Sequence, residues 1–332
     1  MKQKVAVIGG GSWGTAVANV FADAGNPTTL WSRDPLVADQ MNRNHTNEKY
    51  LKGLSLNPEL KATSDLAGAL DEAEVVVCSI PTQQIRNVFL PHTSRFRGKT
   101  VVNTSKGIEV GTNACVSEIF FELAPQSPYV MLSGPSFAQE VVQRLPTAVT
   151  VASKNSQINE RVQQALKTQY FRAYRSHDVV GVELAGALKN VIAIASGMVT
   201  GLKLGYNAQA AIINRGIAEI MRMGKKRGAE PLTFLGLAGV GDLILTCTGP
   251  LSRNRRLGVA LGEGKNLTQI QQELGGVAEG VYTAKSAREL ARIMGVEMPI
   301  TEQVYSILYE QGTAQKALLE LMSRDLKEEW ES

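Results

Sequence analysis

Cysteine and histidine are scarce in this chain of 332 residues, which contains three of each. A sparse, odd set of cysteines far apart in the sequence is typical of a reducing compartment rather than of a disulfide framework. No histidine lies near another metal-binding residue at useful spacing, so we predict neither a histidine relay nor a metal site. The residues concerned are Cys78, Cys115, Cys247, His45, His92 and His177.

Long runs of one charge and long apolar runs are also missing. The net charge of +4 comes from 35 basic and 31 acidic residues, and the longest basic block is Lys225-Lys226-Arg227. This pattern argues against a nucleic-acid partner, whereas a mild positive excess suits a small anionic substrate. The apolar stretch before the first glycines is shorter than the ~7–15 residues of a signal peptide, and no unbroken run of ~18 apolar residues occurs. We therefore expect a soluble, cytoplasmic protein with no integral membrane segment.

Two kinds of hydrophobic pattern divide the chain. Up to about residue 175, short apolar runs alternate with helix-length segments, which predicts a mostly parallel sheet covered by helices on both faces. From residue 178 to 328 nearly all of the spacing is helical. We therefore predict an α/β domain over residues 1–177 and an all-helical domain over residues 178–332. The predicted strands are KVAVIGG, TTLW, EVVVCSIP, TVVNTSKG, YVMLSG, TAVTVAS and FRAYRS.

The stretch VAVIGGGSWG begins with the first of these strands, and its glycine-rich turn leads into a predicted helix over residues 12–24. Its glycines have the spacing G-x-G-x-x-G, which in a βαβ unit allows a tight turn, approach of a pyrophosphate and close packing of helix on strand. Free N–H groups at the helix start bind phosphate. We therefore predict a Rossmann-type dinucleotide-binding domain. The residues of the turn expected at the cofactor are Gly9, Gly11, Ser12, Trp13 and Gly14.

The end of the second predicted strand bears on the choice of dinucleotide. NAD-specific sites usually carry Asp or Glu there to hold the ribose 2′-OH. Here the strand is followed by Ser32, Arg33 and Asp34, and a guanidinium at this place can bind a 2′-phosphate. We expect Asp34 to cap the helix that begins DPLVADQM. NADP(H) is therefore favoured and NAD(H) tolerated, with an ordinary surface arginine as the alternative for Arg33.

Lys189 lies in the stretch ELAGALKNVIAIASG, which leaves almost no polar face on a helix. A helix that is apolar all round is normally buried, and a buried ammonium is costly unless it is paired or its pKa falls. Lysine in such a place can serve as a general base. The alternative is a lysine that extends its long stem to the surface.

Four further stretches place polar residues at the ends of strands or the starts of helices, where ligands bind in open α/β proteins. In the last of them, SRN, N-cap chemistry, a helix dipole and a guanidinium suit a phosphate. Each stretch also has a structural alternative, and Asp242 in particular could cap the helix DLILTC. The residues are Lys106 in NTSKGIE, Gly134, Ser136 and Ala138 in SGPSFAQE, Asp242 in GLAGVGDLILTC, and Ser252, Arg253 and Asn254 in TGPLSRNRRLG.

Taken in order, these stretches resemble the bacterial NAD(P)-dependent glycerol-3-phosphate dehydrogenases. The resemblance implies reversible reduction of dihydroxyacetone phosphate, a small phosphorylated substrate, to sn-glycerol 3-phosphate with NADP(H) or NAD(H). That reaction supplies the backbone of phospholipids. The shared stretches, which span nearly the whole chain, are GGGSWGTA, SIPTQ, SKGIE, SGPSFAQE, ELAGALKNVIAIASG, GLAGVGDLILTC, SRNRRLG and VAEGV.

The resemblance also implies roles for individual residues. Lys189 would be the general acid/base, Lys106 would lie between cofactor and substrate, and Asp242 would orient Lys189 or the substrate. The residues implied in substrate binding are Lys106, Gly134, Ser136, Lys189, Asp242, Ser252, Arg253 and Asn254. Those implied in cofactor binding, besides the glycines, are Ser12, Trp13, Arg33, Lys106, Ala138, Arg253, Val277 and Glu279.

Opposing effects act on the pKa of Lys189. Burial and the like charge of Lys106 lower it, whereas the negative charge of Asp242 raises it, so the net shift stays open here. Glu279 either hydrogen-bonds the cofactor or only complements the dipole at a helix start.

Other functions stay open beside this one. A two-domain dehydrogenase acting on β-hydroxy acids would share the glycine turn and a helix-borne lysine but would not need the SRN stretch. A regulatory protein that senses the dinucleotide would not need Lys106, Lys189 and Asp242 together. A homodimer is the expected assembly, because nicotinamide dehydrogenases are commonly oligomeric and oligomers default to two-fold symmetry.

Overall fold

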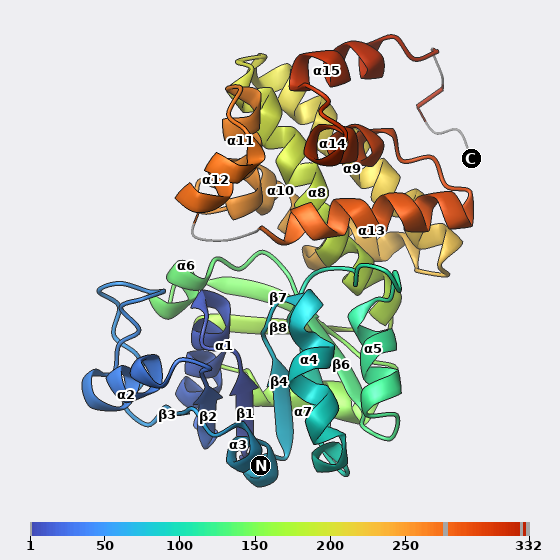
Figure 1. Cartoon of the computed structure of the whole chain (residues 1–332). Coiled ribbons are helices and arrows are strands. Elements are labelled where there is room, and N and C mark those ends of the chain that lie inside the picture. The colour runs from blue at the N-terminus through green and yellow to red at the C-terminus, as the bar shows by residue number, and fades with distance from the viewer. Residues whose placement is uncertain (1, 275–277, 326–327, 330–332) are drawn as a thin grey trace.

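The computed structural model describes residues 2–274, 278–325 and 328–329. Figure 1 shows a lower part that holds the strands and an upper part built from helices. The chain passes from the first to the second between Ser176, the last strand residue, and Val179, the first residue of helix α8. We therefore propose residue 177 as the domain boundary.

Within the described residues, eight strands form one sheet in the order β3-β2-β1-β4-β5-β6-β7-β8. All neighbours are parallel except β6 and β7, so the prediction of a mostly parallel sheet is confirmed. The seven predicted strands are present. The eighth strand, β3, was not predicted, because a strand of three residues with one buried apolar side chain leaves no recognisable pattern in the sequence. The strands are β1 (Val5–Ile8), β2 (Thr28–Trp31), β3 (Lys61–Thr63), β4 (Val75–Cys78), β5 (Thr100–Asn103), β6 (Tyr129–Ser133), β7 (Thr147–Ala152) and β8 (Phe171–Ser176).

Both faces of the sheet are buried, because successive side chains of a strand point to opposite sides. In β1, Val5 and Val7 belong to one hydrophobic core with α1, α6 and α7. Ala6 and Ile8 belong to a second core, on the other face, with α3, α4 and α5. The helices of this part are α1 (Ser12–Asp23), α2 (Pro35–Asn44), α3 (Leu66–Glu72), η1 (Thr82–Gln84), α4 (Ile85–Phe89), η2 (Leu90–Phe96), α5 (Val116–Leu123), α6 (Ala138–Val142) and α7 (Ser156–Ala165).

The upper part is helical throughout its described residues, as predicted, and packs around α8. Residues 181–199 of α8 are all buried. The elements are α8 (Val179–Gly201), α9 (Gly205–Lys226), η3 (Pro231–Leu235), η4 (Leu237–Gly241), α10 (Asp242–Thr248), α11 (Arg253–Gly262), α12 (Leu267–Glu273), α13 (Glu279–Met294), α14 (Pro299–Tyr309) and α15 (Ala314–Met322).

By length and composition alone, α8 is apolar enough to cross a membrane, with a mean hydropathy of 1.6 over its best window. However, 94% of that window is buried by other segments of the chain. A helix covered in this way is what the core of a globular domain contains.

Close packing of α8 against α11 sets the position of the SRN stretch. A Cβ atom added to Gly197 would lie 2.2 Å from the Arg255 carbonyl oxygen, and one added to Gly258 would lie 2.0 Å from that of Ile194. The two helices therefore approach to a distance that only glycine allows. As a result, the first turn of α11 lies beside the middle of α8, where Lys189 is found.

Candidate active site

The glycine turn between β1 and α1 has the geometry of a phosphate-binding loop. Gly9 has a φ of 132°, and a Cβ added there would lie 2.3 Å from the Ser79 carbonyl oxygen. A Cβ added to Gly14 would lie 1.9 Å from the carbonyl oxygen of Gly9, whereas nothing lies within 4 Å of one added to Gly11. Gly9 and Gly14 are thus required by the turn itself, and Gly11 leaves room for a ligand.

Polar groups lie at the start of α1, next to Gly11 in the chain. Gly11 is the N-cap and supplies no side chain to the first N–H groups of the helix. The indole Nε1 of Trp13 is buried without a hydrogen-bond partner among the described residues. Ser12 donates its hydroxyl to the carbonyl oxygen of Tyr50, at 3.1 Å. Unpaired donors at a helix start suit the anionic pyrophosphate of a dinucleotide, so the turn fits such a cofactor.

At the end of β2, Asp34 caps α2 as predicted, because its Oδ1 accepts a hydrogen bond from the Leu36 N–H at 3.1 Å. Arg33 is exposed next to it. Ser32 is buried, and its hydroxyl accepts from the backbone N–H of Asp34 at 3.3 Å. Of the predicted cofactor residues at this strand end, Arg33 is therefore the one whose side chain is open to a ligand.

Lys189, Asp242 and Lys106 come together at the junction of the two parts. Lys189 donates from Nζ to Asp242 Oδ1 at 2.5 Å and to the Thr246 hydroxyl at 2.8 Å. Lys106, just past the end of β5, donates to Asp242 Oδ2 at 2.6 Å. The Lys189 side chain is only 9% exposed, so it does not extend to the surface. Asp242 does not cap α10, since its carboxylate is held by the two lysines.

The electrostatics of this cluster resolve the opposing effects on Lys189. Burial lowers the pKa of Lys189 to about 8, more strongly than Asp242 raises it, and the charge of Lys106 lowers it further. Burial acts to raise the pKa of Asp242, but attraction to Lys106 and Lys189 outweighs this and lowers it. Two ammonium groups around one carboxylate leave a net positive charge, which attracts an anionic substrate.

Asn254 and Asn190 join four segments around this cluster. The amide of Asn254 donates to Asn190 Oδ1 at 2.9 Å and accepts from the Gly280 N–H at 3.0 Å. Asn190 in turn donates to the carbonyl oxygen of Lys106 at 3.3 Å. The sequence reasoning missed Asn190 and Thr246. Their places in the sequence could have identified them, because Asn190 directly follows Lys189 and Thr246 lies one helical turn after Asp242.

The SRN stretch begins α11 as predicted. The hydroxyl of Ser252 accepts from the Arg255 N–H at 3.2 Å and so caps the helix. Ser252 and Asn254 are buried, whereas Arg253 is exposed. A cationic side chain at the first residue of a capped helix suits an anion such as a phosphate.

The SGPSFAQE stretch lies between the sheet and α10. Gly134 has a φ of 149°, and a Cβ added there would lie 2.8 Å from the Val149 Cα. Ser136 donates its hydroxyl to the carbonyl oxygen of Gly134 at 3.0 Å. Pro135, between them, lies against Gly241, the residue before Asp242. Ala138 instead begins α6, which packs on α1, and so lies toward the glycine turn.

Glu279 begins α13 and reaches the sheet-containing part. Its Oε1 accepts from the Thr82 N–H at 3.3 Å. Its Oε2 and the Thr82 hydroxyl are both buried with no partner in the described part of the chain, and a Cβ added to Gly107 would lie within 3 Å of each. Burial raises the pKa of Glu279 to about 7. Two buried polar atoms without partners, next to Lys106, point to a ligand at this place. A glutamate that only complemented the dipole of its helix would not explain them. Val277 lies outside the described residues.

Comparison with known proteins gives the family of this arrangement. Residues 4–159 match the N-terminal domain of the NAD-dependent glycerol-3-phosphate dehydrogenases, and residues 178–319 match their C-terminal domain. The chain belongs to this family.

Relatives and a solved structure agree along the whole length. A glycerol-3-phosphate dehydrogenase (NAD(P)+) of Citrifermentans bemidjiense is 50% identical, with 99% of each chain covered. One of Anaeromyxobacter dehalogenans is 49% identical, with 98% of this chain and 99% of the relative covered. The crystal structure of glycerol-3-phosphate dehydrogenase from Coxiella burnetii superimposes with a TM-score of 0.93 at 40% identity, covering 97% of this chain and 99% of that one.

Membership of the NAD-dependent glycerol-3-phosphate dehydrogenase family confirms several predictions. The resemblance, the fold class, the enzyme class and a nicotinamide dinucleotide cofactor are all as expected. The hydroxy-acid dehydrogenase and the non-catalytic sensor gain no support from these full-length matches.

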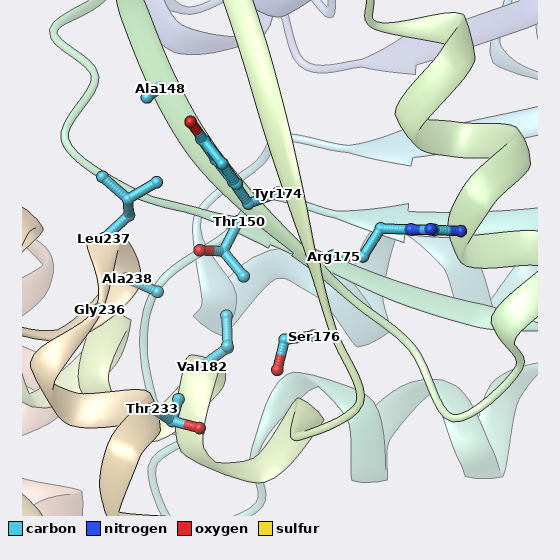
Figure 2. Close-up of a pocket in the computed structure, with 10 residues that line it drawn as sticks. All are labelled: Ala148, Thr150, Tyr174, Arg175, Ser176, Val182, Thr233, Gly236, Leu237 and Ala238. Carbon is cyan, nitrogen blue, oxygen red and sulfur yellow. The ribbon is translucent and has the colours of Figure 1, made fainter.

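A cavity of about 430 Å³ lies between the outer strands β7 and β8 and η4. Figure 2 shows Leu237 and Ala238 of η4 facing the strands that carry Thr150 and Tyr174. None of the predicted site residues lines this cavity, although Ala148 of its lining lies against Gly134.

Proposed function

We propose that this chain catalyses the reversible reduction of dihydroxyacetone phosphate to sn-glycerol 3-phosphate with NAD(P)H. The observation that carries the proposal is the buried Lys189–Asp242–Lys106 cluster, which Asn190 and Asn254 join to a helix start suited to phosphate, in a chain whose glycine turn suits a dinucleotide. The reaction needs a cofactor, a proton donor and a phosphate anchor, and these features supply a candidate for each.

The glycine turn and its neighbours hold the cofactor in this proposal. When bound, the dinucleotide supplies hydride to C2 of the substrate or accepts it from there. Gly11 leaves room for the pyrophosphate, and Trp13 Nε1 is an available buried donor. Thr82 and Glu279 offer their orphaned oxygens beside Lys106. The remaining cofactor contacts proposed are Gly9, Ser12, Gly14, Arg33, Lys106, Ala138, Arg253 and Val277.

Lys189 moves the proton. In the direction of reduction its ammonium donates a proton to the C2 oxygen, and in the reverse direction the neutral amine takes the proton back. A pKa of about 8 keeps both forms accessible near neutral pH. Asp242 and Thr246 fix the position of Nζ, and the charge of Lys106 stabilises negative charge that develops on the oxygen.

The first turn of α11 anchors the phosphate. Arg253 supplies the charge, while Ser252 and Asn254 lie buried beside it. Asn254 is itself fixed through Asn190 and Gly280, which ties the phosphate anchor to the backbone of Lys106. A rigid link of this kind holds C2 at a constant distance from the proton donor. Gly134 and Ser136 complete the proposed substrate site.

The physiological setting is also part of the proposal. We infer a preference for NADPH over NADH from the exposed Arg33 at the end of β2. We further propose that the enzyme acts as a homodimer in the cytoplasm and supplies the glycerol backbone of phospholipids.

One assay tests the reaction. Absorbance at 340 nm is followed with purified protein, NADPH or NADH, and either dihydroxyacetone phosphate or dihydroxyacetone. Oxidation that requires the phosphate on the substrate supports the proposal. No oxidation of either cofactor with either substrate contradicts it.

A further inference from the structure

The segment between α2 and β3 covers one side of the glycine turn. Asn47 donates from Nδ2 to the Gly10 carbonyl oxygen at 3.1 Å and to the Thr15 hydroxyl at 2.8 Å. The carbonyl oxygen of Tyr50 accepts from the Ser12 hydroxyl. The residues between these two contacts are thus held against the start of α1, and one of them, Lys49, reaches Asp34 just past the end of β2. In a G-x-G-x-x-G βαβ unit the ribose nearest the adenine lies at this place.

Asp34 stands where NAD-specific sites place an acidic residue, yet both of its oxygens are engaged. Oδ1 accepts from the Leu36 N–H at 3.1 Å, and Oδ2 accepts from Lys49 Nζ at 2.8 Å. A carboxylate bound on both sides is a poor acceptor for a ribose 2′-OH. Its charge is also matched by an ammonium, so it repels a nearby phosphate less.

The balance of charge at this rim is positive. Arg33 is exposed beside Asp34, and its charge acts on Lys49. The hydrogen bond between Asp34 and Lys49 lowers the pKa of the carboxyl and raises that of the ammonium, so both are charged at neutral pH. Lys49 also lies 5.6 Å from the centre of the Tyr50 ring. Two cations and one carboxylate leave one net positive charge, whereas without Lys49 the charges of Arg33 and Asp34 would cancel.

We propose that Lys49 is a residue that determines cofactor specificity, because it masks Asp34 and, with Arg33, forms the subsite for a ribose 2′-phosphate. The inference rests on the proposed function, which supplies the dinucleotide. It goes further because it assigns the selection between NADPH and NADH to Lys49, in the segment that covers the turn, as well as to Arg33 at the end of β2.

Calorimetric binding of two cofactor fragments, 2′,5′-ADP and 5′-AMP, tests the subsite without the nicotinamide. Loss of a charge-assisted contact predicts that Lys49→Met weakens 2′,5′-ADP by about tenfold and leaves 5′-AMP nearly unchanged. Adding Asp34→Asn to Lys49→Met removes the exposed carboxylate and restores part of the loss. Lys52→Met, an exposed lysine of the same segment, serves as the matched control and leaves both affinities unchanged.

The outcomes separate the two proposals. If the ratio of the affinity for 2′,5′-ADP to that for 5′-AMP is the same in the wild type, Lys49→Met and Lys52→Met, while NADPH is still bound and oxidised, only the role of Lys49 is overturned. Binding of NADPH to the wild type is measured by quenching of tryptophan fluorescence. If the wild type does not bind NADPH, the proposed function is overturned, and the subsite with it. The single variant Asp34→Asn gives an independent check, since it is expected to tighten 2′,5′-ADP relative to 5′-AMP.

Discussion

Lys189 and Asp242 form a buried ion pair of 2.5 Å although 53 positions separate them in the chain. The pair crosses from the middle of α8 to the first residue of α10. Because the same carboxylate also holds Lys106 from the sheet-containing part, one side chain fixes the proton donor relative to both parts of the molecule. Changes at either partner therefore have separate, measurable effects.

Replacing Lys189 removes the proton donor but none of the groups proposed to hold the dinucleotide. We expect Lys189→Met to lower kcat by a factor of about 10²–10⁴, the usual contribution of general acid/base catalysis. Binding of NADPH, measured by tryptophan quenching, should be unchanged. Methionine keeps most of the side-chain volume, and Lys154→Met on the surface is the control. A kcat within a factor of about two of the wild type would rule out Lys189 as the acid/base.

Asp242 raises the pKa of Lys189, so its removal should lower that pKa below about 8. In the oxidation of glycerol 3-phosphate the neutral amine is required, and the rate rises with pH through this pKa. We therefore expect the rising limb of the pH–rate profile to move to lower pH in Asp242→Asn. The profile is measured as kcat/KM over a pH series, with Asp39→Asn, an exposed residue of α2, as the control.

The same substitution should also destabilise the fold. It leaves the buried Lys189 beside Lys106 without their shared carboxylate, and breaking a buried ion pair costs about 3–5 kcal/mol. Thermal unfolding followed by circular dichroism gives the size of the loss. If the pH limb stayed in place while the protein lost stability, Asp242 would be a structural partner that does not tune Lys189.

Arg253 lies exposed at the start of α11, where the phosphate anchor is proposed. A charge-assisted bond to phosphate contributes about 1.5–3 kcal/mol, so Arg253→Ala should raise the KM for dihydroxyacetone phosphate roughly 10-fold to 100-fold. The KM for unphosphorylated dihydroxyacetone should change far less. Arg256→Ala, an exposed arginine of the same helix, is the matched control. Equal effects on the two substrates would show that Arg253 does not hold the phosphate.

The sequence predicts the individual residues of this site better than the contacts that join them. Lys106, Lys189 and Asp242 each stand out through an apolar or glycine-framed surrounding, which local patterns reveal. That one carboxylate bridges both lysines depends on how α8, α10 and the sheet pack, and no local pattern encodes such a contact. The direction of the Lys189 pKa shift was open for the same reason, since burial and distance had to be known together.

The segment over the glycine turn shows the other limit. It contains neither a helical nor an alternating pattern long enough to place it, and β3 at its end has only three residues. The hydrogen bonds of Asn47 and the ion pair of Lys49 are made with residues that precede them by up to 37 positions. The cap at Asp34 was predictable because it acts on a residue only two positions away.

Glu279 gives a prediction on stability. Its pKa is raised by burial from 4.5 to about 7, so the folded protein binds this proton more tightly than the unfolded chain. The resulting stability is fully present below about pH 4.5 and is lost as the pH rises to about 7. Glu279→Gln cannot ionise, and its free energy of unfolding should therefore fall less between these pH values, by at most about 3 kcal/mol.

Urea unfolding at about pH 5 and about pH 8 measures this difference. The matched control is Glu289→Gln, an exposed position of the same helix, which should keep the pH dependence of the wild type. Because the orphaned Oε2 is also proposed to meet the cofactor, Glu279→Gln should weaken NADPH binding while making the protein without cofactor more stable at about pH 8. A gain of stability and a loss of binding in one variant is the sign of a residue kept for its ligand rather than for the fold. An unchanged pH dependence would mean that the carboxylate is already solvated in the absence of the cofactor.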